Sequence, residues 1–362
     1  MGLLLLEILL RVFLVSRATS FDQIRDTQIR DWGGEVTLFD IIRPAPEKER
    51  VYELIPGATG IFVGAPLSVN ADGFRDTTWT LQAEPGVERI AVIGDSIAFG
   101  WGVPTKDRFS DILQSKLNEL AGAGSTSSTL SAGKSTRYQV MNYGVPSYNS
   151  VMELATFRAK ALPYKPKIVI VNLVGNDDEL PGFLRIKPQA WSLSKCFIYE
   201  SIRDQMVGRK FGDTARLAAG GVVQTGGIGH GPKILGYRPE LVPPEYRGLM
   251  GRDSMNKALN DIVAECRTHG IRAIGFIYRR IEKPTAEAVP LVDDEWLLEP
   301  AQKAGFEVLD GSTAMAKWLS DNRQPAGALT VSPNDMHPNK IAHEILANTL
   351  LTAFTDSGTT TP

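Results

Sequence analysis

The sequence predicts an α/β protein: a three-layer α/β/α sandwich with a central parallel sheet of about five strands, plus a small β-rich N-terminal extension. Three observations lead to this fold class. Apolar, β-branched runs recur along the chain, as expected for strands buried in a parallel sheet. Helical segments separate these runs, which is the pattern of right-handed crossover units. Two of the runs also end abruptly in glycine and short polar residues, which places reactive side chains at the carboxyl edge of the sheet.

From residue 87 onward, predicted strands and helices alternate along the chain. We expect strands at 89–93, 138–142, 167–174, 271–278 and 306–310. We expect helices at 107–120, 150–162, 197–206, 256–269, 295–304 and 338–354. The first of these helices is typical, because Phe109, Ile112, Leu113 and Leu117 fall on one helical face.

Composition divides the chain into three parts. Residues 1–19 form an apolar N-terminal segment, and residues 20–86 form a β-rich extension in which short β-prone pieces (35–39, 51–55, 60–63) alternate with turn formers. The main domain spans 87–355. It contains an insertion at 179–251, rich in glycine and proline, which is too long for a simple connection and is expected to face the substrate or cap the site.

The N-terminal segment is the most apolar stretch of the chain. It lacks a basic leader, carries Glu7 and Arg11 one helical turn apart, and is shorter than the ~20 residues that cross a bilayer. Three interpretations stay open: a helix docked on the protein, an interfacial anchor, or the tail of a longer membrane segment. We favour membrane attachment, and with it a location at the cell envelope.

Composition also excludes several function classes. The 362 residues are 43% apolar and 22% charged, which is ordinary for a globular protein. A formal charge of −2 disfavours nucleic acid as a partner. Two cysteines, Cys196 and Cys266, give no disulfide framework, and their spacing leaves open whether they pair. The four histidines form no Cys/His cluster, so we expect neither a metal nor another cofactor.

Residues able to carry acyl-transfer chemistry lie at two places. Ser96 follows Gly94 and Asp95 at the end of the first strand, where it is either a nucleophile or simply part of a turn and helix cap. Asp335 and His337 precede the last helix, whose first position we assign to Pro338. A serine hydroxyl is a weak nucleophile at neutral pH, so Ser96 needs His337 as general base, and Asp335 would orient that base.

Four separated blocks in a fixed order give the chain a resemblance to the SGNH (GDSL-type) hydrolase superfamily. They are Gly94-Asp95-Ser96, Asn142-Tyr143-Gly144, Gly175-Asn176-Asp177 and the block 335–339. The similarity covers about residues 88–354, and the N-terminal extension resembles that of longer bacterial members. The resemblance implies a flavodoxin-like sandwich and esterase or acyltransferase chemistry. It also implies an oxyanion hole formed by the backbone N–H groups of Ser96 and Gly144 and the side-chain amide of Asn176.

The chain departs from the family pattern at two positions. Gly175 directly precedes Asn176, where the commonest pattern has an intervening residue. The usual acid lies three residues before the histidine, a position that holds Asn334 here. We assign Asp335 as the acid and keep Asn334 as the alternative. The resulting Asp-x-His spacing is similar to that of relatives that handle O-acetyl groups of polysaccharides.

The sequence therefore predicts a serine esterase that hydrolyses a small acyl ester, such as an O-acetyl group on a carbohydrate, through an acyl-serine intermediate. An O-acyltransferase acting on an envelope polysaccharide would share the same residues, and a non-catalytic glycan-binding or assembly protein would retain only the fold. Asp95 and Asp177 are expected to organise their turns. We interpret His343 as a packed or surface residue of the last helix rather than a second base, and His230 as a residue of a flexible loop rather than one that reaches the substrate.

Overall fold

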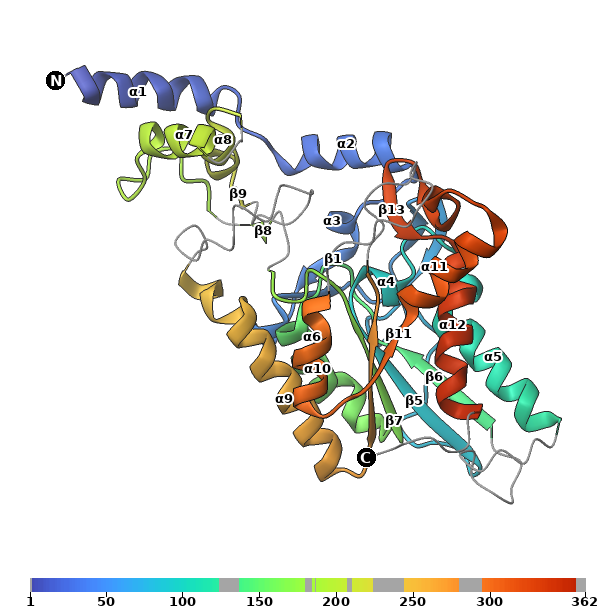
Figure 1. Cartoon of the computed structure of the whole chain (residues 1–362). Coiled ribbons are helices and arrows are strands. Elements are labelled where there is room, and N and C mark those ends of the chain that lie inside the picture. The colour runs from blue at the N-terminus through green and yellow to red at the C-terminus, as the bar shows by residue number, and fades with distance from the viewer. Residues whose placement is uncertain are drawn as a thin grey trace. The chain divides into compact units, whose positions relative to one another are not determined.

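The computed structural model describes residues 2–123, 137–179, 184–185, 187–206, 210–223, 244–279 and 295–355. Its contacts divide the chain into two compact units (Figure 1). Unit 1 comprises Met1–Gly33 and Glu179–Gly248, and unit 2 comprises Gly34–Asp178 and Leu249–Pro362. The domain limits expected from composition stay a prediction.

Unit 2 is built on one sheet of five parallel strands, as predicted. In spatial order these are β11 (Glu307–Asp310), β10 (Arg272–Ile277), β7 (Ile168–Leu173), β5 (Val87–Ile93) and β6 (Arg137–Asn142). All six residues of β7 are buried, as are the last five of β5, because both strands lie inside the sheet and are covered on both faces. The carboxyl ends of β6, β5 and β7 therefore lie side by side at one edge.

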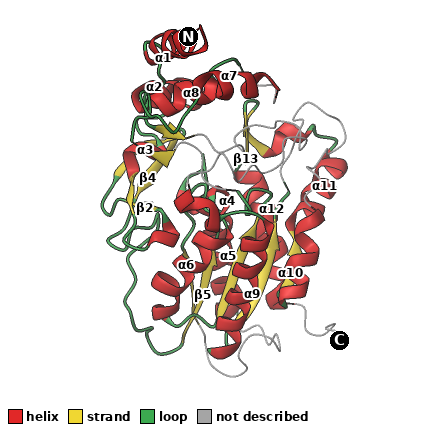
Figure 2. Cartoon of the chain, turned by 90° about the vertical axis from the view of Figure 1, so that its left-hand side faces the viewer, coloured by secondary structure: helices red, strands yellow, loops and turns green. Residues whose placement is uncertain are grey.

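Helices cover both faces of this sheet (Figure 2). One face packs against α5 (Phe109–Gly122), α11 (Gly311–Asn322) and α12 (Lys340–Thr355), which share a continuous apolar core with the strands. On the other face lie α6 (Ser150–Thr156), α9 (Arg252–Thr268) and α10 (Leu298–Ala304). The helix expected over 150–162 continues beyond α6 as a π-helical turn and then a 3₁₀ turn that ends at Tyr164. The expected α/β/α sandwich is confirmed.

The N-terminal part of unit 2 holds two small antiparallel pairs, β1 (Ile42–Pro44) with β2 (Tyr52–Leu54) and β3 (Thr59–Phe62) with β4 (Ala65–Ser68). The prediction of a strand over residues 35–39 is wrong. Gly34 and Val36 form only isolated bridges to Phe62, and Leu38–Ile41 is the short helix α3. The reason is local capping, because the Asp40 carboxylate accepts hydrogen bonds from the backbone N–H and hydroxyl of Thr37.

Unit 1 is mainly helical. It comprises α1 (Gly2–Val15), α2 (Phe21–Trp32), α7 (Phe197–Met206), α8 (Asp213–Ala219) and the short pair β8 (Leu184–Arg185) and β9 (Val222–Val223). Helix α2 replaces part of the β-rich extension expected from residue 20, because Ser20 and Gln23 form a capping box. Helix α1 packs on α7 and α8 through Leu14. Among the described residues, no helix combines the length and hydropathy needed to span a membrane.

Candidate active site

The first block places Ser96 where β5 ends and the four-residue helix α4 (Ser96–Phe99) begins. Gly94 is required by close packing, since a Cβ there would lie 2.9 Å from the Asn172 Cβ. Asp95 caps α4, because its Oδ1 accepts a hydrogen bond of 2.9 Å from the Ile97 N–H. Ser96 Oγ lies 3.2 Å from Asp95 Oδ2, and the residue is 9% exposed.

A β-hairpin carries the histidine block. Strand β12 (Thr330–Ser332) pairs with β13 (Asp335–Pro338), so the expectation that Pro338 occupies the first helical position is wrong. Asn339 caps α12 instead, with its Oδ1 accepting hydrogen bonds from the backbone N–H groups of the next helical turn. Alternate residues of a strand face the same side, which is why Asp335 and His337 point together.

The structure brings Ser96, His337 and Asp335 into one hydrogen-bonded chain. His337 Nε2 lies 2.9 Å from Ser96 Oγ, and His337 Nδ1 lies 2.6 Å from Asp335 Oδ1. The backbone N–H of His337 also donates to Asp335 Oδ1, at 3.1 Å. Asn334 stays outside this chain, since it is exposed and its backbone N–H donates to Ser332 Oγ.

Trp101 is a further member of the site that sequence reasoning missed. Its Nε1 donates to Asp335 Oδ2 at 2.8 Å, and its ring stacks on His337 with centroids 4.7 Å apart and planes 16° apart. Burial raises the pKa of Asp335, but the hydrogen bonds and charge of His337, together with the Trp101 hydrogen bond, outweigh burial and hold the pKa below its usual value. Asp335 is therefore a carboxylate at neutral pH.

The three residues expected to form an oxyanion hole surround the same turn. Gly144 lies so close to α4 that a Cβ would be 2.4 Å from the Phe99 nitrogen, which excludes any larger residue. Its N–H donates to Asn142 Oδ1 at 2.9 Å. Asn176 Nδ2 donates to Asp95 Oδ2 at 3.2 Å. The ends of β6 and β7 thus flank Ser96, and two of the three donor groups hydrogen-bond to side chains of the first two blocks.

Two buried acids lie behind this turn. Asp177 Oδ2 accepts the Val174 N–H, and its backbone carbonyl accepts the Ser150 N–H. The Glu153 carboxyl is fully buried, and neither of its oxygens has a hydrogen-bond partner among the described residues. Burial, followed by the negative charge of Asp95, raises the pKa of Glu153 well above its usual value. Burial therefore favours the neutral, protonated form of Glu153, and no motif in the sequence indicated this residue.

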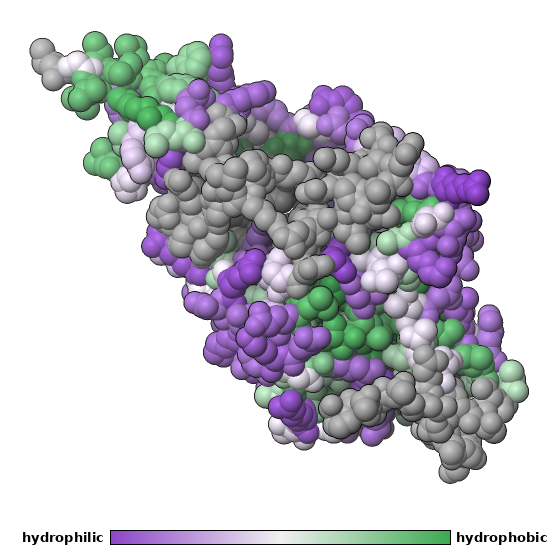
Figure 3. All heavy atoms as spheres, viewed as in Figure 1, coloured by the Kyte–Doolittle hydropathy of each residue, from purple (hydrophilic) through white to green (hydrophobic). Residues whose placement is uncertain are grey.

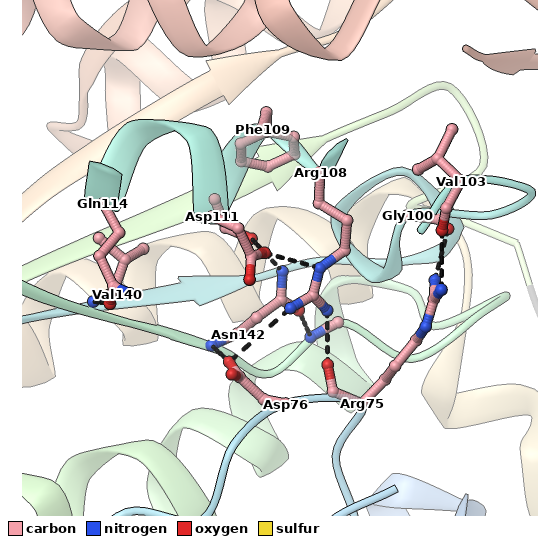
Figure 4. Close-up of polar contacts among 12 residues, drawn as sticks. Arg75, Asp76, Gly100, Val103, Arg108, Phe109, Asp111, Gln114, Val140 and Asn142 are labelled. Carbon is pink, nitrogen blue, oxygen red and sulfur yellow. Dashed lines mark hydrogen bonds and ion pairs between the residues drawn. The ribbon is translucent and has the colours of Figure 1, made fainter. Parts of the chain in front are cut away.

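A buried polar network fixes the loop after Ser96 (Figure 4). Arg75, which is 2% exposed, donates to the carbonyl oxygens of Gly100 and Val103, both at 2.7 Å. Arg108 donates to the Arg75 carbonyl oxygen at 2.6 Å and pairs with Asp111 at 2.8 Å. The turn at 70–76 therefore holds the segment that carries Trp101.

The same network continues to the second block. Asp76 Oδ2 accepts the Asn142 N–H at 2.8 Å (Figure 4). Asn142 Nδ2 donates to the Ala98 carbonyl oxygen at 2.7 Å. Burial raises the pKa of Asp76 to about 6, although Arg108 acts in the opposite direction. Asn142 therefore links α4 to the turn that carries Gly144.

The remaining candidates lie elsewhere. His343 is buried, its Nδ1 accepts the Phe109 N–H at 3.3 Å, and burial followed by the charges of Arg108 and Arg75 lowers its pKa to about 3. It is a packed residue, which is one of the two alternatives that the sequence leaves open. His230 lies outside the described residues. Cys196 and Cys266 are both free thiols, one exposed and the other buried.

A family model described as the GDSL-like Lipase/Acylhydrolase family matches residues 92–345. Similar solved structures include a putative lipolytic protein of the G-D-S-L family from Desulfitobacterium hafniense DCB-2, with 15% identity over 72% of this chain and 97% of that one, at a TM-score of 0.38.

Two others are esterases of acetylated xylan. An acetyl xylan esterase has 12% identity over 73% of this chain and 98% of its own, at a TM-score of 0.42. An acetylxylan esterase from Geobacillus stearothermophilus has 15% identity over 75% and 95%, also at 0.42. No curated protein matches the chain. Because the family model spans well over half of the sequence, the chain belongs to the GDSL-like lipase/acylhydrolase family, whose members are hydrolases acting on ester bonds.

Proposed function

We propose that this protein is a serine esterase in which Ser96 is the nucleophile, His337 the general base and Asp335 the acid that orients the base. The observation that carries the proposal is the continuous chain from Ser96 Oγ through the imidazole to the Asp335 carboxylate. A binding protein that merely retained the fold would have no need of an imidazole within hydrogen-bond reach of a hydroxyl whose other neighbour is a carboxylate.

The reaction follows from these positions. His337 Nε2 takes the proton of Ser96 as Oγ attacks the acyl carbon, and the imidazolium then protonates the departing alcohol. The resulting acyl-Ser96 is hydrolysed by a water molecule that His337 activates in the same way. Asp335 accepts three hydrogen bonds and donates none, so it holds the Nδ1–H tautomer and stabilises the imidazolium.

We assign the oxyanion to the backbone N–H groups of Ser96 and Gly144 and to Asn176 Nδ2. Asn176 carries two amide hydrogens, so one can bind Asp95 while the other binds the oxyanion. The Gly144 N–H, which donates to Asn142 in the free protein, would be shared with the oxyanion or released to it. Each such donor contributes about 10²–10³ in turnover.

For the substrate we propose a small acyl ester, with an O-acetyl group on a carbohydrate as the preferred class. The support is the spacing of Asp335 and His337, which resembles that of relatives acting on polysaccharide O-acetyl groups. The geometry serves a water molecule and a sugar hydroxyl equally as acceptor, and the family to which the chain belongs favours water.

The test is hydrolysis of p-nitrophenyl acetate by the purified full chain, with Ser96→Ala as the control and circular dichroism to show that both are folded. We expect nitrophenol release that depends on Ser96, and an acetyl adduct on Ser96 by mass spectrometry. Acetate released from an acetylated xylooligosaccharide would support the carbohydrate substrate. Absence of Ser96-dependent release and of an adduct, from folded protein, would contradict the proposal, and acetyl transfer to an added oligosaccharide would indicate an acyltransferase.

A further inference from the structure

Unit 1 has an unusual surface. Among the described residues, the large apolar side chains that are exposed belong to unit 1 with only two exceptions, Leu81 and Ile341. Figure 3 shows this concentration as hydrophobic atoms gathered over α1. Soluble proteins rarely expose contiguous apolar surface of this kind unless it binds a partner or a membrane.

The two charged residues of α1 do not face outward. Glu7 accepts hydrogen bonds from the Phe197 and Ile198 N–H groups, at 2.8 and 2.9 Å, at the start of α7. Arg11 is 7% exposed, pairs with Glu7 at 2.8 Å and donates to the Ala190 carbonyl oxygen at 2.9 Å. The charges that argue against a membrane segment in the sequence are therefore neutralised on the inner face of α1.

The rest of α1 is apolar on every side that does not face α7 and α8. At 100° per residue, the exposed positions are distributed around the helix rather than along one stripe. These exposed residues are Leu3, Leu4, Leu5, Leu6, Ile8, Leu9, Val12, Phe13 and Val15. A protein groove or a second copy of the chain would cover one stripe of such a helix, whereas fluid hydrocarbon contacts all of it.

Helix α7 likewise exposes apolar side chains and buries charged ones. Its exposed apolar residues Tyr199, Ile202 and Met206 are 61%, 52% and 80% exposed and recur at helical spacing. Its charged residues are buried, with Arg203 paired to Glu200. Asp204, also buried, accepts the Thr214 N–H of α8 at 2.9 Å. A water-facing helix has the opposite arrangement, so α7 gives independent support to what α1 indicates.

We propose that unit 1 binds a lipid membrane by inserting the outer faces of α1 and α7 into the hydrocarbon of one leaflet. Helix α1 has 14 residues. At ~1.5 Å per residue these residues span about 21 Å, more than the half-thickness of the ~30 Å hydrocarbon core and therefore enough to enter one leaflet. This inference is independent of the proposed esterase activity.

The experiment is flotation of the full chain with vesicles of phosphatidylcholine alone, which carry no net charge. We expect the wild-type protein to float with the vesicles and to remain bound at about 1 M salt, because insertion is apolar rather than electrostatic. Leu5→Ser with Leu9→Ser, both residues being 58% exposed, should lower the partition coefficient by at least about tenfold. Leu81→Ser is the matched control, since Leu81 is 60% exposed in unit 2 and should leave flotation unchanged.

A second pair of substitutions keeps the proposal testable if the α1 variant does not fold. Ile202→Ser with Met206→Ser should also weaken flotation, with the unfolding temperature of each variant measured alongside. Wild-type protein that stays out of the vesicle fraction would overturn the proposal, as would folded variants that float like wild type. The proposal would also be overturned if the wild-type protein formed a dimer that Leu9→Ser dissociates and neither form bound vesicles. The apolar surface would then bind a second copy of the chain.

Discussion

Asp335→Asn tests the site most directly, because Asp335 accepts hydrogen bonds and makes none as a donor. Its Oδ1 accepts from His337 Nδ1 and from the His337 backbone, and its Oδ2 accepts from Trp101 Nε1. An asparagine replaces one of these oxygens with an NH₂ group, so a donor must face another donor whichever way the amide is turned.

The two orientations bracket the expected loss. If the new NH₂ faces Trp101, one buried donor is left unpaired, which costs about 1–3 kcal/mol, and the imidazolium also loses its carboxylate partner. If the NH₂ faces His337, it favours the wrong imidazole tautomer, and such losses reach about 10⁴ in kcat. We therefore expect kcat to fall by about 10²–10⁴, with KM little changed because neither orientation alters substrate contacts.

The assay is steady-state hydrolysis of p-nitrophenyl acetate, with Asn334→Ala as the matched control. Asn334 is the neighbouring residue, is exposed and lies outside the hydrogen-bonded chain, so its substitution should change kcat by less than about threefold. Asp335→Asn activity within about fivefold of wild type would refute the reasoning. An equal loss of kcat in Asn334→Ala would indicate that Asn334 or its neighbours, and not Asp335 alone, orient His337.

Three further predictions follow from the buried polar contacts. Trp101→Phe keeps a ring beside His337 but removes the donor to Asp335, so kcat should fall by about tenfold; an unchanged kcat would make the Trp101 hydrogen bond irrelevant to turnover. Arg75→Met leaves several buried carbonyl oxygens without donors and should lower the free energy of unfolding in urea by about 3 kcal/mol; a loss below about 1 kcal/mol would show that water replaces the guanidinium. Burial, then nearby arginine charges, lowers the pKa of His343 to about 3 from 6.5, so the unfolded chain takes up the proton first. The stability that depends on neutral His343 is intact above pH 6.5 and is lost by about 1.4 kcal/mol per unit as the pH falls toward 3. In His343→Gln, whose amide oxygen can still accept the Phe109 N–H, unfolding should depend less steeply on pH over this range; equal slopes would exclude His343 as the cause.

The parallel sheet could be predicted because its information is local. The buried parts of β5 and β7 contain the apolar runs 90–93 and 168–171, and each strand is followed by a glycine and short polar residues. Parallel strands place those ends at one edge, so the sequence also predicts that Ser96 and Asn176 lie near each other. The contact of Asn176 with Asp95 agrees with this prediction.

The parts that could not be predicted depend on partners distant in sequence or on capping signals that compete with composition. The β-prone appearance of residues 35–39 concealed the capping pair Thr37 and Asp40, which starts a helix. The sequence around Trp101 does not indicate a site residue, because its hydrogen-bond partner Asp335 lies 234 positions away. The inward orientation of Glu7 and Arg11 likewise depends on hydrogen bonds with backbone groups of residues 190–198, so it could not be predicted from the N-terminal segment alone.

The stack of Trp101 on His337 has an optical consequence. The emission of an indole depends on the groups that contact its ring, and here the imidazole is nearly parallel to it, with ring centroids 4.7 Å apart. The chain has six tryptophans, so the emission that disappears in Trp101→Phe isolates this one. The protein thus contains its own fluorophore stacked on the imidazole, so a change in this emission would report a movement of the His337 ring without an added dye.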